Sequence, residues 1–323
     1  METIIKEGLL STPKFVPHWY LYDTYGSILF DKIAMENPYY HLYRTEKSIL
    51  QQKADEIVSE SDDVVLCELG AGSSTKTTLL LSALLKRNTT VTFIPIDQAK
   101  DFMENSVKTL VQRFNVGLEV KPFAGDYIDG LNYIKDINQN KLIIWLGSSI
   151  SNMSMKNLKS ILAHINTIMG ENDRLLIGID ITQDKDKVVT MYKHFQTWAP
   201  FNFNVLTRLN REFGADFKHE NFVMYTNYVA SDDKNGIVEN PQYVQHALES
   251  TCQHQVHVDD LDLMLNFEAG ELFYCHELEH MSLKWNWKQF ADTMKKGGFR
   301  IEKTWSDDGN RFGLARLRKN EYI

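Results

Sequence analysis

The sequence predicts an α/β fold built on a doubly wound, parallel sheet. Two observations lead to this prediction. Apolar runs of strand length alternate with amphipathic stretches of helix length through the middle of the chain, which has 323 residues. The glycine turn ELGAGSSTKT follows the first apolar run and precedes a leucine-rich stretch, a pattern that indicates strand, turn and helix. Alternating strands and helices form parallel sheets whose strands end along one edge.

Strands and helices can be assigned in order through this central part. The expected strands are Val64–Gly70, Thr90–Asp97, Leu118–Gly125, Lys141–Ser148 and Arg174–Asp180. The expected helices between them are Thr77–Lys86, Phe102–Phe114, Tyr127–Ile134 and Met155–Met169. Each strand candidate is a short apolar run, and each helix candidate carries apolar residues at helical spacing.

The alternation stops after Asp180 and resumes near the C-terminus. A helix is expected near Trp287–Lys296, followed by a hairpin of FRIEKTW and RFGLARLRK. Residues near 184–283 are rich in aromatic side chains and are expected to be irregular. We therefore expect a discontinuous ligand-binding domain of residues 46–182 and 285–323. Residues 1–45 and 183–284 would form a second, substrate-binding domain over the ligand edge.

Composition and charge limit the classes of partner. The chain is 43% apolar and 24% charged, which fits a soluble globular protein. Its net charge of −8 argues against a dedicated polyanion binder. It has no apolar run of membrane-spanning length, and its three cysteines are unpatterned. We expect a cytoplasmic monomer that takes a small-molecule substrate and binds neither nucleic acid nor membrane.

Polar residues at the ends of the predicted strands point to the ligand. A carboxylate at the end of the second strand, Asp97, can accept both hydroxyls of a ribose diol. Asp126, at the end of the third, can pair with an adenine amino group while Tyr127 stacks on the ring. Taken alone, each acid is also explained as a helix N-cap. Their order along one edge favours a single ligand site.

The glycine loop narrows the choice of ligand. It lacks the third glycine of the dinucleotide fingerprint GxGxxG, and its glycine spacing differs from that of a P-loop. The pattern E-x-G-x-G followed by two strand-end acids fits an S-adenosylmethionine site better.

Longer segments carry a more specific signal. They are TPKFVPHWYLYDTYGSILFDKI, PYYHLYRTEKSIL, ELGAGSSTKT, FIPID, AGDY, WLGSSISNMS, FNFNVLTRLNREFGADF and MSLKW…WSDDGNRFGLA. In these segments, nearly end to end, the chain resembles the histidine-specific N-alpha-methyltransferase family of ergothioneine biosynthesis. The resemblance implies a class I methyltransferase of Rossmann-like fold. Its S-adenosylmethionine would methylate the α-amine of histidine or a histidine derivative, giving a hercynine-type betaine and S-adenosylhomocysteine.

The resemblance also implies roles for individual residues. S-adenosylmethionine would be held by the glycine loop and the strand-end acids, namely Gly70, Gly72, Lys76, Asp97, Asp126 and Tyr127. The acceptor's carboxylate would be held by Tyr39, Asn152 and Tyr192. Tyr22 would lie near the amine, which makes Tyr22 and Tyr39 the candidate catalytic residues. Such a clamp suits a carboxylate because it donates hydrogen bonds without adding formal charge. Transfer from a sulfonium needs a neutral amine in near-attack geometry and no metal.

One segment departs from the family pattern. The family reads the acceptor's side chain with a T-E-x-S-x-K pattern, and here that place reads EHMSLK, residues 279–284. Ser282 and Lys284 match, whereas His280 takes the position of the glutamate unless a one-residue shift lets Glu279 serve. The acceptor side chain would then meet His280 and Ser282. The alternatives are therefore ring methylation of a thiohistidine or methylation of an aromatic amino acid's amine.

The same stretch matches a metal motif. Residues 276–280 read HELEH, which fits the zinc-protease pattern HExxH. That chemistry needs both histidines on one helical face and a third ligand, whereas the context ELFYC-HELEH-MSLKW is at least as typical of a strand. We predict no metal site. A zinc hydrolase and a ligand-binding relative that has lost catalysis are the alternatives from other classes.

Overall fold

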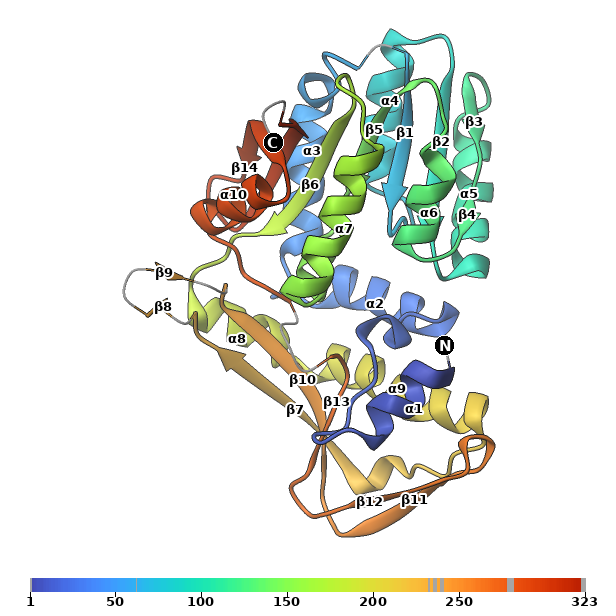
Figure 1. The fold of residues 1–323 in the computed structure, drawn as a ribbon, viewed down its shortest axis with the longest axis vertical. Coiled ribbons are helices and arrows are strands. Elements are labelled where there is room, and N and C mark those ends of the chain that lie inside the picture. The colour runs from blue at the N-terminus through green and yellow to red at the C-terminus, as the bar shows by residue number, and fades with distance from the viewer. Residues whose placement is uncertain are drawn as a thin grey trace.

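The main sheet confirms the predicted doubly wound fold. The computed structural model describes residues 2–61, 63–231, 233–234, 237–238, 241–277 and 282–320. The sheet has the strand order β14-β15-β6-β5-β1-β2-β3, with β4 also paired to β2 (Figure 1). Its strands are β1 (Val64–Leu69), β2 (Val91–Asp97), β3 (Leu118–Val120), β4 (Phe123–Ala124), β5 (Asn140–Trp145), β6 (Arg174–Asp180), β14 (Phe299–Ser306) and β15 (Phe312–Lys319). Strands β1 to β6 run parallel, and β15 is antiparallel to both its neighbours.

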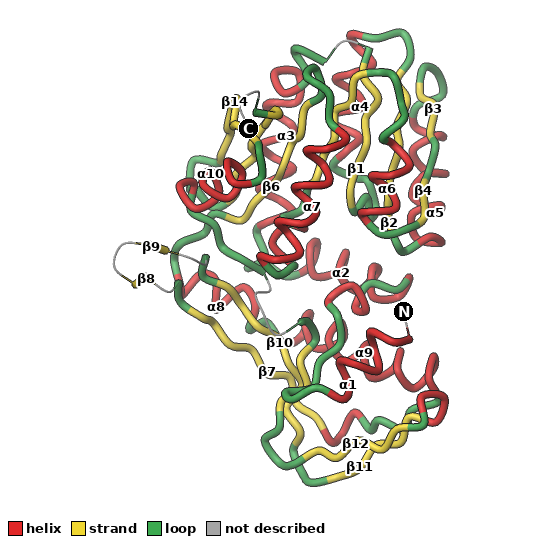
Figure 2. The backbone as a smooth tube through the Cα atoms, in the orientation of Figure 1, coloured by secondary structure: helices red, strands yellow, loops and turns green. Residues whose placement is uncertain are grey.

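Helices cover both faces of this sheet (Figure 2). One face carries α6 (Tyr127–Ile134), α7 (Met155–Ile168) and α10 (Trp287–Lys296), and the other carries α3 (Leu42–Ile57), α4 (Thr77–Arg87) and α5 (Lys100–Arg113). Successive β1 residues alternate between the two cores: Val65 and Cys67 pack with the α6 and α7 side chains, and Leu66 packs with those of α3 and α4. This burial on both faces explains why the strands are continuous apolar runs.

Two sequence predictions need correction. The strand expected over Leu118–Gly125 is divided into β3 and β4, because Pro122 has no N–H to continue the ladder. The described residues between 184 and 283 are not irregular. They hold α8 (Lys185–Tyr192), the 19-residue α9 (Phe195–Phe213), and a sheet of β13 (Leu272–Tyr274), β10 (Tyr243–Ser250) and β7 (Phe222–Val229).

Aromatic residues of this region contribute to a regular helical pattern on α9. On α9 the buried side chains Trp198, Phe201, Val205 and Leu209 recur at helical spacing. The other elements that the structure describes in this region are short strands and 3-10 helices: β8 (Asp233–Lys234), β9 (Ile237–Val238), β11 (His254–Val258), β12 (Leu263–Phe267), η3 (His219–Asn221) and η4 (Asp259–Leu261).

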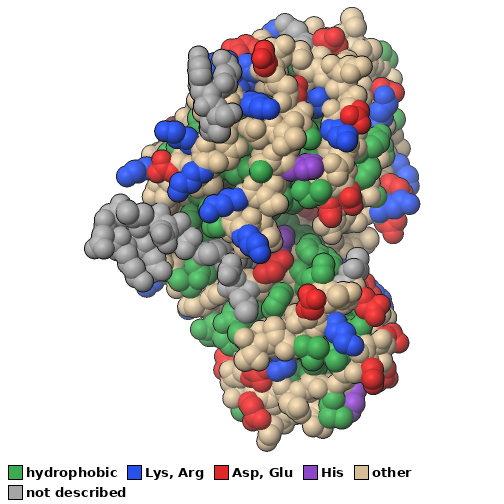
Figure 3. All heavy atoms as spheres, in the orientation of Figure 1, with side chains coloured by type: hydrophobic (Ala, Val, Ile, Leu, Met, Phe, Trp, Pro, Cys, Tyr) green, Lys and Arg blue, Asp and Glu red, His purple; other side chains and the backbone are tan. Residues whose placement is uncertain are grey.

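The N-terminal segment packs with this second region. It contains α1 (Glu2–Leu10), η1 (His18–Leu21) and α2 (Thr24–Glu36). Val16 donates to the carbonyl of Tyr274 at 3.0 Å, and Tyr274 donates back to Lys14 at 2.9 Å, so the segment extends the edge at β13. The two parts of the molecule meet near its middle, and the face shown in Figure 3 is hollowed there.

None of the helices in the described ranges has the combination of length and hydropathy needed to cross a bilayer.

Candidate functional site

The cavity between the two parts lies at the switch point of the sheet. Strand β1 pairs with β2 on one side and β5 on the other, and such a point opens a crevice at the carboxyl ends of the strands. The cavity has an empty volume of about 1700 Å³, its open mouth included. Its polar and aromatic lining includes His18, Tyr22, Asp31, Tyr40, Glu68, Gly70, Gly72, Lys76, Asp97, Tyr127, Asn152, Tyr192, Trp198 and Ser282.

The glycine loop has the backbone form that the sequence predicts. Gly70 has φ +71° and Gly72 has φ +50°, values that side chains rarely tolerate. A Cβ added at Gly70 would lie 3.1 Å from the Tyr127 hydroxyl. The loop is fixed to β2, because Gly70 donates to the carbonyl of Ile96 at 2.9 Å. A ligand can therefore lie directly on the backbone here.

Asp97 links this loop to the end of β2. Its carboxylate accepts from Gly72 N at 2.8 Å and from Ala99 N at 2.9 Å. Burial raises its pKa above the usual range despite these hydrogen bonds. The remaining lone pairs of a cavity-lining carboxylate are free to accept from a ribose diol.

Glu68 adds a second buried acid beneath the loop. Its carboxyl oxygens each lie 2.7 Å from the Thr77 hydroxyl, and burial raises its pKa to about 8. The sequence pattern contained this residue as the first letter of E-x-G-x-G, without assigning it a role.

We expect the substitution E68Q to stabilise the ligand-free protein increasingly as the pH rises. The Glu68 carboxyl has an ordinary pKa of 4.5 and a folded-state value of about 8. Between these values the folded chain keeps a proton that the unfolded chain has lost, so stability falls with rising pH and levels off above about 8. Glutamine mimics the protonated form. Urea denaturation from about pH 5 to 8 should show the gap growing by a few kcal/mol, on the order expected from such a shift. A gap that stays constant with pH would contradict a protonated Glu68.

Lys76, predicted to contact the cofactor, lines the cavity and also makes an ion pair with Glu46 of α3. The Glu46 side chain is fully buried and also accepts from Gly147 N, at 2.9 and 3.0 Å. Glu46 therefore joins the loop after β1 to the loop after β5.

The residues predicted for the acceptor divide into two groups. Tyr22, Asn152, Tyr192 and Ser282 line the cavity together. Tyr39 does not: it is 53% exposed, and its ring contacts His194. The neighbouring Tyr40 lines the cavity instead. His280 and Glu279 lie outside the described residues.

Asp126 is also absent from the cavity lining. Its carboxylate caps α6 by accepting from Asp129 N at 2.9 Å, which is the simpler role that the sequence allowed. Tyr127 next to it does line the cavity. Any adenine contact of Asp126 stays a prediction.

The cavity tyrosines are donors rather than bases. Burial raises the pKa of Tyr22 and of Tyr40 well above 10. The Tyr22 ring packs edge-on against Phe30 and Phe201. Both hydroxyls therefore keep their protons at neutral pH, and an amine bound here loses its proton to another group or to water.

Of the HELEH motif, only His276 and Glu277 lie among the described residues. His276 and Glu277 lie in a bend after β13 rather than in a helix. Glu277 accepts from His18, whose Nδ1 lies 3.0 Å away, and His276 Nδ1 lies 2.6 Å from the Glu277 carbonyl. No group of three or more His, Cys, Asp or Glu side chains within the described ranges could hold a metal ion.

Sequence reasoning missed several cavity residues that lie inside the motifs it used. Asp31 ends the LFD segment and Tyr40 is the second tyrosine of PYY. Burial raises the pKa of Asp31. His18, paired with Glu277, lies in the VPHWY segment. All three residues lie inside segments that carry the family resemblance, but no local pattern singles them out.

Comparison with known proteins agrees with this geometry. The family described as histidine-specific methyltransferase, SAM-dependent, matches residues 1–319. The histidine N-alpha-methyltransferase of Mycobacterium tuberculosis is 31% identical over 98% of this chain and 94% of its own. That of Mycolicibacterium smegmatis is 29% identical over 96% and 92%. The 4-dimethylallyltryptophan N-methyltransferase of Trichophyton verrucosum is 26% identical over 58% of each chain.

The matched residues include the glycine loop, the acid at the end of β2 and the tyrosines of the N-terminal segment. The chain therefore belongs to the family of histidine-specific, S-adenosylmethionine-dependent methyltransferases.

Proposed function

We propose that this methyltransferase acts on the α-amine of free histidine and forms its betaine. The observation that carries the proposal is that one cavity is lined both by a glycine loop with a strand-end acid and by neutral hydrogen-bond donors. The glycine loop and Asp97 would cradle the nucleoside. Tyr22, Asn152 and Tyr192 line the same cavity and would present neutral hydrogen-bond donors to the acceptor.

The cradle suits S-adenosylmethionine in charge and in shape. Asp31 and Asp97 bring acidic groups to the wall that would face a sulfonium and an ammonium. The bound molecule supplies a methyl group on a cationic sulfur, ready for in-line displacement. The chain's contribution is to place the amine in near-attack geometry, which is worth several kcal/mol of the barrier.

The second region would hold the acceptor over this cradle. We assign residues 1–45 and 183–284 to acceptor binding and residues 46–182 and 285–323 to cofactor binding. Tyr192 and Asn152 would hold the carboxylate, with Tyr40 replacing Tyr39 as the third aromatic contact. Tyr22 would steer the neutral amine, and its proton would leave to water. The three cysteines Cys67, Cys252 and Cys275 are free, which supports a reducing, cytoplasmic setting.

Incubation with S-adenosylmethionine and each of the twenty amino acids, followed by mass spectrometry, tests this proposal. We expect histidine to gain up to three methyl groups and to be turned over faster than any other amino acid. Thiohistidine and a prenylated tryptophan belong in the panel, because one relative is named for an acceptor of the latter kind. Preferential methylation of either would contradict histidine as the acceptor and retain the reaction type. A catalytically silent protein that still binds S-adenosylhomocysteine would contradict the reaction itself.

A further inference from the structure

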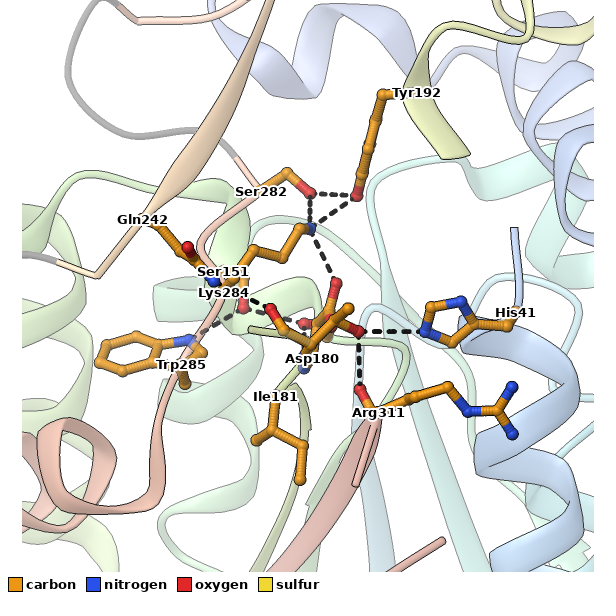
Figure 4. Close-up of polar contacts among 12 residues, drawn as sticks. His41, Ser151, Asp180, Ile181, Tyr192, Gln242, Ser282, Lys284, Trp285 and Arg311 are labelled. Atoms are coloured by element: carbon orange, nitrogen blue, oxygen red, sulfur yellow. Dashed lines mark hydrogen bonds and ion pairs between the residues drawn. The ribbon is translucent and has the colours of Figure 1, made fainter. Parts of the chain in front are cut away.

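Lys284 is a buried ammonium that contacts Asp180, Tyr192 and Ser282 (Figure 4). It is 1% exposed. Its Nζ lies 2.8 Å from Asp180 Oδ2, 2.9 Å from the Tyr192 hydroxyl and 2.8 Å from the Ser282 hydroxyl. Tyr192 and Ser282 line the cavity, whereas Lys284 is not among its lining residues. Lys284 can therefore influence a ligand through these two hydroxyls.

The charge on Lys284 is secured by its surroundings. Burial opposes the charge, but Asp180 and Tyr192 outweigh burial and raise the Lys284 pKa. The Asp180 side chain is fully buried as well, and its other oxygen accepts from Thr182 N at 2.9 Å. The Lys284 backbone donates to Gln242 at 2.7 Å and that of Trp285 donates to Asp180 at 2.8 Å. The pair is thus braced by the backbone on both sides.

Counting protons shows what this arrangement presents to a ligand. An ammonium has three N–H donors and no acceptor, and Lys284 has three oxygen partners. Both hydroxyls therefore accept from Lys284. They also hydrogen-bond to each other, which uses one of their two protons. One hydroxyl proton remains, and both residues line the cavity.

We propose that Lys284, held by Asp180, is a positioning residue that keeps the Tyr192–Ser282 hydroxyl pair as a hydrogen-bond donor to the acceptor's carboxylate. Ser282 would then serve the carboxylate rather than the acceptor's side chain, which is the role that the sequence predicts for it. The inference rests on the proposed function and adds a residue to it. Without the ammonium, either hydroxyl could rotate and accept from a ligand N–H instead. With it, the pair favours an anionic acceptor atom, while the Asp180 charge cancels that of Lys284 and avoids a net cationic pocket.

A charge-neutral pair of double variants tests the role. Replacing Lys284 alone would leave Asp180 buried and unpaired, which destabilises a protein strongly. D180N/K284M removes both charges and all three donors, and D180N/K284Q removes both charges but leaves an amide donor. D55N/K86M is the matched control, because Lys86 and Asp55 form an exposed pair with side chains 65% and 70% accessible.

We expect D180N/K284M to raise the KM for histidine about 10- to 100-fold, the range for one hydrogen bond to a charged group. D180N/K284Q should recover part of this loss, and D55N/K86M should match wild type. The affinity for S-adenosylhomocysteine, measured by calorimetry, should stay within about threefold, because the cradle is formed by other residues. Histamine, which lacks the carboxylate, should inhibit wild type and both Lys284 variants with similar constants.

The readouts separate the two proposals. A wild-type protein that does not methylate histidine contradicts the proposed function. A wild type that does, alongside an unchanged KM in D180N/K284M, contradicts only the role of Lys284. Equal losses for histidine, histamine and S-adenosylhomocysteine would also overturn it, because they would show general damage to the cavity.

Discussion

E46A is expected to lower the free energy of unfolding by about 3 kcal/mol, the lower end of the range for breaking a buried ion pair. Two partly buried partners depend on this carboxylate. Lys76 would keep its ammonium with its side chain only 16% exposed, and Gly147 N would lose both of the acceptor oxygens that it has on Glu46. The partial exposure of Lys76 lets water recover some of the cost, which is why the lower end is expected.

Two variants isolate the cause. E46Q keeps an acceptor for Gly147 and removes the charge, so it should fall between E46A and wild type. D55A removes the partner of an exposed lysine, Lys86, and should cost less than about 1 kcal/mol. Urea denaturation of the ligand-free proteins measures all three. If E46A is no less stable than D55A, Glu46 does not connect the two loops energetically.

A loss of cofactor affinity should accompany the loss of stability in E46Q. Lys76 and Gly147 both line the cavity, and Glu46 fixes them from behind. An added Cβ at Gly147 would lie 3.3 Å from Lys76 Nζ, so the two loops are close enough to move together. The double-mutant cycle of E46Q and K76M measures this coupling in S-adenosylhomocysteine affinity.

The cofactor half of the site could be predicted from the sequence because its determinants are local. Gly70 and Gly72 follow a continuous apolar strand, and Asp97 ends the next one. A parallel sheet brings such strand ends together whatever the rest of the chain does. The same reasoning predicts a ligand contact for Asp126, but this carboxylate caps α6, the helix that follows it.

The acceptor half depends on contacts that no local pattern reveals. Tyr39 and Tyr40 lie between two helices, where no periodicity says which side chain turns inward. Asn37 decides it: its side-chain oxygen accepts from the backbone of both tyrosines, at 3.0 and 3.2 Å, and its amide donates to Met191. This turn leaves Tyr39 exposed and buries Tyr40.

The polar network behind the acceptor needed the tertiary structure as well. Asp180 ends β6, and Lys284 lies far along the chain. They meet because the segment before α10 returns to the end of β6. There the backbone of Lys284 pairs with that of Gln242, and Trp285 N donates to the Asp180 carbonyl. The family pattern T-E-x-S-x-K includes Lys284, but only the fold shows that Asp180 is its partner.

D97A is expected to weaken binding of S-adenosylhomocysteine by about 3 kcal/mol, roughly 100-fold or more, the scale of losing charged hydrogen bonds to a ribose diol. Asp97 also accepts from Gly72 N, so D97A releases the glycine loop in addition to removing the diol's acceptor. D97N retains one oxygen and should lose less affinity.

The stability of D97N should change much less than its affinity for the nucleoside. Burial raises the Asp97 pKa, which means that a charged Asp97 carboxylate lowers the stability of the ligand-free protein. A neutral amide avoids that cost, but it keeps an acceptor oxygen for only one of Gly72 N and Ala99 N. The two effects oppose each other, so ligand-free D97N should stay close to wild type in stability near neutral pH while it binds the nucleoside more weakly. Calorimetry and urea denaturation of D97A, D97N and the exposed control D101N measure both quantities. Unchanged affinity in D97A would refute the ribose assignment, and a D97N variant that loses stability and affinity together would mean that Asp97 serves the fold rather than the ligand.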